Sequence, residues 1–167
     1  MDFKIKPIAK EAAIAALEKA KQYRVLNEPA ESESICLDIL HTNPDNLEAK
    51  ITLLLALTDQ FDRTMNECFK RAMELLSEIN DDYSKIYYEG IICERRGKAH
   101  LRSGGLGCGP VAYEWLCQAM TLFEKAEKIR PEGNDESILR WNSCARMIAR
   151  YNELEPGSDE SGEHMLE

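Results

Sequence analysis

The chain has 167 residues, of which 44% are hydrophobic and 31% charged, as is usual for a soluble globular domain. Its formal net charge of −9 argues against binding to DNA or RNA, whose phosphates select basic proteins. No run of 18 apolar residues occurs and the N-terminus lacks the apolar stretch of a signal peptide, so we expect no contact with a membrane.

Seven helices are predicted in chain order, and the alternating pattern typical of β-strands is missing throughout. They are expected over about residues 7–26, 29–41 and 46–60, then from about 62, 80 and 110 onward, and finally over 134–152. Asn46 or Asp45 is expected to cap the third helix, and the run 80–82 to cap the fifth. The sequence therefore predicts an all-α protein.

The fifth and sixth helices are expected to be unusually long. About 17 residues are added between Gly90 and Ala119, compared with the two equivalent connections earlier in the chain. Residues 103–109 are glycine-rich and irregular, and Pro110 is suited to restart a helix. We expect a helical hairpin lengthened by about two turns per helix, which adds roughly 11 Å.

Two helical patterns recur along the chain and interleave. The pairs Ala20–Tyr23, Leu54–Leu57 and Gly90–Cys93 recur every 34 to 36 residues. The second pattern is Ser32-x3-Cys36-x2-Ile39-x4-Pro44, then Met65-x3-Phe69-x2-Ala72-x4-Ser77, then Ala119-x3-Phe123-x2-Ala126-x4-Pro131. Such a pattern resembles the tetratricopeptide repeat, a helix–turn–helix unit of about 34 residues.

This resemblance implies a right-handed α-solenoid of antiparallel helix pairs in which each unit docks on the next. The repeats are expected over about 13–46, 47–81 and 82–133, followed by a capping helix over 134–152, all within a domain spanning 1–153. Residues 154–167 are rich in Pro, Gly, Ser and acidic residues and contain no Lys or Arg. We expect them to form a disordered acidic tail.

In tetratricopeptide arrays the first helix of each repeat lines a concave groove. Phasing the repeats on Gly90 and its equivalents gives a partner-binding set formed by Tyr87, Tyr88, Arg95, Asn142 and Arg146. Tyr and Arg often anchor interfaces, and Arg is suited to carboxylate or phosphate. The alternative is that the arginines pair with acidic residues on the helix surfaces, Glu89, Glu94 and Glu136 among them.

No catalytic, metal or cofactor site is indicated. The glycine-rich segment lacks the G-K-[ST] ending of a phosphate-binding loop, and no nucleophile–base pattern occurs. The three histidines and six cysteines show no metal-ligand spacing and no C-x-x-C pair. Cysteines without such spacing indicate a reducing, cytoplasmic setting in which disulfides do not form.

The function expected from these features is non-catalytic: an adaptor that binds a protein partner's peptide, acidic or phosphorylated, in the concave groove. Repeats that clamp the C-terminal carboxylate of heat-shock chaperones use Lys and Asn in the first helix, Asn in the third, and Lys and Arg in the fifth. The matching positions here are, in the same order, Leu17, Lys21, Thr52, Ser84 and Tyr88, and none carries the residue type required there. That clamp is missing. Two alternatives stay open: self-association into a homo-oligomer through the lengthened third hairpin, and an RNA-binding helical repeat, which the negative charge disfavours.

Overall fold

A computed structural model describes residues 4–157 and contains seven α-helices and one short 3₁₀ helix within that range. The helices are α1 (Ala13–Val25), α2 (Pro29–Thr42), α3 (Leu47–Thr58), α4 (Phe61–Ser77), α5 (Asp82–Ser103), α6 (Cys108–Lys128) and α7 (Glu136–Arg150), and the 3₁₀ helix is η1 (Lys10–Ala12). The described residues form no strand, so the all-α prediction is confirmed. None of these helices is long and apolar enough to cross a membrane.

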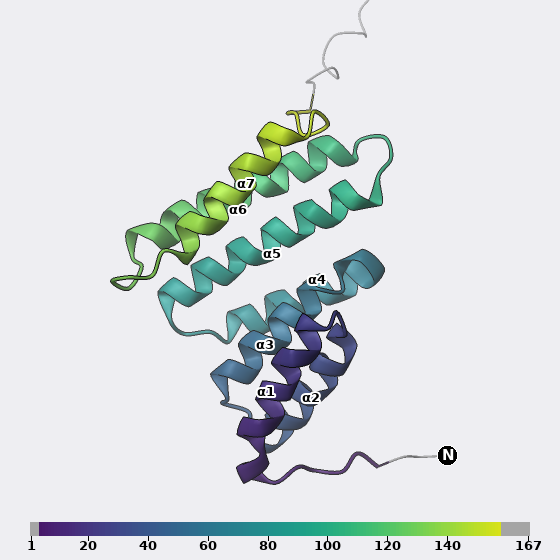
Figure 1. Ribbon diagram of the computed structural model, residues 1–167, viewed down its shortest axis with the longest axis vertical. Helices are drawn as coiled ribbons and strands as arrows, with labels where there is room; N and C mark the ends of the chain where they lie inside the picture. The colour runs from purple at the N-terminus through teal and green to yellow at the C-terminus, as the bar shows by residue number, and fades with distance from the viewer. Residues whose placement is uncertain (1–3, 158–167) are drawn as a thin grey trace, which may run out of the picture.

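The helices stack in chain order along the long axis of the molecule (Figure 1). Each α-helix packs against the next one in the chain, and α3 also contacts α1 and α5. No comparably close contact joins two even-numbered helices within residues 4–157. The odd-numbered helices are therefore closer together than the even-numbered ones. We call the surface made by α1, α3, α5 and α7 the odd-helix face.

Polar side chains cap α3 and α5 where the sequence predicts. Asn46 accepts a hydrogen bond from the backbone N–H of Ala49 at 3.0 Å, and Asp81 accepts one from Ser84 at 2.7 Å. Each of these bonds satisfies an N–H group that the first turn of a helix leaves without a partner.

The first helix starts later than the sequence predicts. Residues 4–9 are not helical, and a 3₁₀ turn over Lys10–Ala12 precedes α1. Ile8 packs on the cluster formed by Leu17, Ile39 and Ala49, and its carbonyl oxygen accepts a hydrogen bond from the Thr42 hydroxyl at 3.3 Å. These tertiary contacts hold the segment across the end of α2, where local helix signals alone would have continued the helix.

The α5–α6 pair is the longest in the chain, with 22 and 21 residues. Small residues spaced seven apart line the contact between the two helices: Gly90 and Gly97 on α5, and Ala112, Ala119 and Ala126 on α6. A Cβ atom placed on Gly90 would lie 2.6 Å from the ring of Phe123. The helices thus approach more closely than larger side chains would allow.

The packed part of the chain continues past the last helix. Leu154 is buried in the cluster that joins α5, α6 and α7. Gly109, at the start of α6, lies directly against the backbone of Glu153. The rest of the expected acidic tail, residues 158–167, lies outside the described residues.

Candidate binding surface

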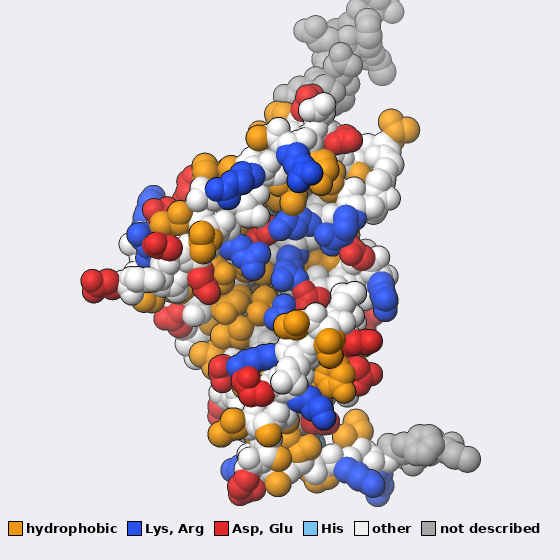
Figure 2. All heavy atoms as spheres, in the orientation of Figure 1, with side chains coloured by type: hydrophobic (Ala, Val, Ile, Leu, Met, Phe, Trp, Pro, Cys, Tyr) orange, Lys and Arg blue, Asp and Glu red, His pale blue; other side chains and the backbone are white. Residues whose placement is uncertain are grey.

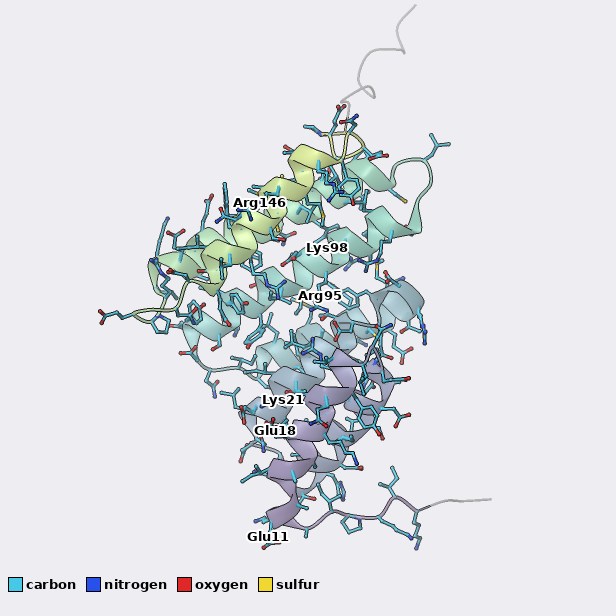
Figure 3. All side chains as sticks on the ribbon, viewed as in Figure 1. Glu11, Glu18, Lys21, Arg95, Lys98 and Arg146 are labelled. Carbon is cyan, nitrogen blue, oxygen red and sulfur yellow. The ribbon has the colours of Figure 1, made fainter. Side chains whose placement is uncertain are left out.

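Basic side chains gather on the odd-helix face although the protein is acidic overall. Figure 2 shows a group of Lys and Arg side chains near the centre of this face, next to hydrophobic ones. Arg95, Lys98 and Arg146 all lie on it (Figure 3), the first two on α5 and the third on α7. The surface therefore differs in charge from the molecule as a whole, whose formal charge is −9.

One carboxylate links three of the odd-numbered helices. Asp59, which ends α3, accepts a hydrogen bond from Arg24 Nε of α1 at 2.7 Å and an ion-paired bond from Arg95 Nη1 of α5. These three residues are 35 and 36 positions apart, which matches the repeat period of the sequence. The ion pairs therefore link three helices at a spacing close to that at which the sequence pattern recurs.

A second carboxylate joins α5 to α7. Glu94 is fully buried, and its Oε1 contacts Lys98 Nζ and, at 3.5 Å, Arg140 Nη1. Its other oxygen, Oε2, has no hydrogen-bond partner among the described residues. A buried carboxylate costs considerable free energy to desolvate, and nearby cations offset part of that cost. Glu94 therefore fixes the positions of two cations whose side chains reach the surface.

A third carboxylate is more exposed. Asp62, near the start of α4, accepts two hydrogen bonds from Arg102 Nε at 3.0 Å and one from its Nη2 at 2.8 Å. Altogether five cations, Arg24, Arg95, Lys98, Arg102 and Arg140, contact only these three carboxylates. Arg146 and Arg150 of α7 make no ion pair with any described residue. The part of the surface around these three carboxylates consequently carries an excess of positive charge.

The pKa of Arg95 reports how closely these cations are grouped. Burial, followed by the charges of Arg24, Arg140 and Arg102, lowers the pKa of Arg95 from 12.5 to about 10, despite its ion pair with Asp59. Arg95 still carries its charge near neutral pH. An added anion would relieve the repulsion among these guanidinium groups.

Three tyrosines of α5 lie toward the start of that helix; Tyr83 and Tyr87 are buried, and only Tyr88 is half-buried and reaches the surface. The rings of Tyr83 and Tyr87 stack with centroids 5.7 Å apart, and Tyr88 meets Tyr87 edge to face at 5.1 Å. Burial, with a smaller contribution from Tyr87, raises the pKa of Tyr88 to about 12. Although burial lowers the pKa of Arg140, Glu94 and the Tyr87 hydroxyl more than compensate and raise it. Arg140 thus lies between the buried tyrosines and the basic part of the surface.

The five partner-binding residues expected from the sequence fall into two groups. Tyr87, Tyr88 and Arg95 lie on one helix, beside the cation cluster. Asn142 and Arg146 of α7 make no hydrogen bond or ion pair with them. Arg140 of α7, in contrast, contacts α5 through Glu94 and Tyr87.

Asp59 was not singled out from the sequence, whereas pairing of the arginines with Glu94 was left open as an alternative, and Arg140 does pair with it. Asp59 had a detectable signal, because Arg24 and Arg95 flank it at the repeat spacing with opposite charge. The position of Arg140 depends on how α7 rotates about its axis when it packs on α6. No local pattern fixes that rotation.

Arg96 belongs to a different environment from its neighbour Arg95. Its guanidinium lies 3.9 Å from the ring centre of Phe69 in α4 and 4.5 Å from that of Trp115 in α6. Cation–π contacts of this kind join the helices on the other side of α5. Arg96 therefore contributes to packing and not to the odd-helix face.

No three His, Cys, Asp or Glu side chains are grouped so as to hold a metal ion within residues 4–157. Comparisons of the chain with protein-family models, with curated proteins and with solved structures each gave no match. The odd-helix face is therefore the feature of the molecule that bears on function.

Proposed function

We propose that this protein is a non-catalytic adaptor that binds an acidic or phosphorylated peptide segment of a protein partner on the odd-helix face. The observation that carries the proposal is the excess of cations over carboxylates on this face of an acidic chain. Arginine offers a planar set of donors that matches carboxylate and phosphate oxygens. A positively charged surface speeds the association with a negatively charged partner and disfavours partners of positive charge.

The proposal includes the fold family. We propose a right-handed solenoid of tetratricopeptide-like helix pairs, supported by the recurring sequence pattern and by the charged residues Arg24, Asp59 and Arg95 at the repeat spacing. In such an array the odd-helix face is the groove. A cytoplasmic location is part of the same proposal, and the six free cysteines support it.

The test uses labelled synthetic peptides, because the partner is unidentified. We expect glutamate-rich and phosphoserine-containing peptides to bind in fluorescence anisotropy, and lysine-rich peptides of equal length not to bind. Replacing Arg146 and Arg150 together by Glu should weaken binding at least about tenfold, a loss that corresponds to about 1.4 kcal/mol. The matched control exchanges Lys125 and Lys128 of α6, two exposed residues, for Glu and should leave affinity unchanged. Equal weakening in both variants would overturn the assignment of the face.

Self-association is a second candidate, favoured by Leu106. This side chain is fully exposed at the glycine-rich tip between α5 and α6. In this second proposal, the exposed leucine at the tip contacts a second copy of the chain. Light scattering of the parent and of Leu106→Glu checks this: a dimer that becomes a monomer supports self-association, and a monomer in both cases excludes it.

A further inference from the structure

The seam between α3 and α5 changes character along its length. Ile51, Leu55 and Asp59 follow one another at four-residue spacing on α3, and Tyr88 and Arg95 are seven apart on α5. Leu55 and Tyr88 are half-buried and pack against both large core clusters, so they lie where the two clusters meet. The ion pair between Asp59 and Arg95 follows about two turns further along α5. The seam is thus apolar at one end and charged at the other.

Not all cations near the charged end are equally available to a ligand. Arg95 is ion-paired with Asp59, and Arg102 makes a bidentate contact with Asp62. Lys98 and Arg140, in contrast, share a single oxygen of Glu94. Arg146 is exposed and has no ion-pair partner among the described residues.

From this arrangement we infer that the ligand has two parts: an apolar side chain that rests on Leu55 and Tyr88, and an acidic group that pairs with Lys98, Arg140 and Arg146. The inference rests on the proposed function and narrows it to one class of peptide. Apolar contact supplies affinity that does not depend on salt, and the acidic group fixes the orientation along α5.

The spacing of the two parts follows from helix geometry. Tyr88 and Lys98 are ten residues apart on α5, which corresponds to about 15 Å along the helix axis. An extended peptide covers that distance in about four or five residues, and a helical peptide in about ten. A peptide with an acidic residue directly beside its apolar residue therefore fits poorly.

Four peptides of equal length test this inference with the intact protein. The first carries Leu five positions from a pair of Glu residues, and the second has Ser in place of that Leu. The third has Gln in place of the Glu pair, and the fourth has Leu directly adjacent to the Glu pair. Because only the peptides change, the fold of the protein is the same in every measurement.

We expect the first peptide to bind at least about tenfold more tightly than each of the other three in fluorescence anisotropy. A photoreactive residue in place of its Leu should crosslink to α3 or α5, and mass spectrometry locates the site. If the Ser peptide binds as tightly as the first peptide, or the crosslink forms elsewhere, the two-part ligand is wrong while acidic-peptide binding stands. If the Gln peptide binds as tightly as the first peptide, the proposed function fails as well.

Discussion

Gly109 and Glu153 touch without room for a side chain between them. A Cβ atom on Gly109 would lie 2.9 Å from the carbonyl carbon of Glu153 and closer still to its oxygen. Both atoms belong to backbone, so neither moves without displacing its segment. The contact seats the segment after α7 on the first turn of α6, where Leu154 enters the core.

Gly109→Ala is therefore expected to lift this segment and lower the free energy of unfolding by about 1–3 kcal/mol. Leu154→Ala should cost a similar amount, because it removes a buried side chain at the same place. Urea unfolding measures both. In the double variant the two losses should not add, since either change alone releases the segment. Fully additive losses would contradict the shared contact.

Gly90→Leu tests the close packing of α5 on α6. The added side chain meets the ring of Phe123, which is fully buried, so we expect a loss of about 1–3 kcal/mol even though leucine favours helix more than glycine does. Gln118→Leu on the exposed side of α6 is the matched control and should be neutral within about 0.5 kcal/mol. Thermal and urea unfolding compare the two. A Gly90→Leu variant as stable as the parent would show that the helices do not pack here.

Asp59→Asn tests the ion pairs that link α1, α3 and α5. Asp59 is only 18% exposed and has two guanidinium partners, so the loss of its charge should cost about 1–3 kcal/mol. Asp62 is 50% exposed, and Asp62→Asn should cost less than about 1 kcal/mol because water screens its pair with Arg102. Chemical unfolding of the two single variants measures the difference. Equal costs would mean that burial does not strengthen the Asp59 pairs.

Alkaline pH should destabilise the protein. Burial raises the pKa of Cys36 to about 11 and those of Cys93 and Cys144 to about 12, from an ordinary value of 9.0. The unfolded chain therefore loses these protons first. Their contribution to stability is full below about pH 9 and falls as pH rises toward the folded-state values.

The urea midpoint at about pH 10 is accordingly expected to lie below that at about pH 8. Cys144→Ala supplies the control: it removes one of the three thiols, so the midpoint should fall less between the two pH values, whatever the variant's initial stability. A midpoint that is the same at both pH values would mean that these thiols ionise equally in the folded and unfolded states.

Much of the architecture was readable from the sequence because helix signals are local. The caps at Asn46 and Asp81 follow from residues only a few positions apart, and the lengths of α5 and α6 follow from the longer spacing between Gly90 and Ala119. The predicted start of α1 was wrong because the backbone of Ile8 is bonded to Thr42, which is far away in the sequence.

The surface was harder to predict than the helices. Arg95 was assigned to the partner-binding set, but its ion-pair partner Asp59 lies 36 residues away and was overlooked. The contact of Arg140 with Glu94 depends on the packing of α7, which no short-range pattern encodes. Residues that act across the stack therefore need the fold before they can be assigned.

The small residues between α5 and α6 have a geometric consequence. They set the distance between the two helix axes, because larger side chains at these positions would act as spacers. Enlarging any one of them should wedge α5 and α6 apart at that point.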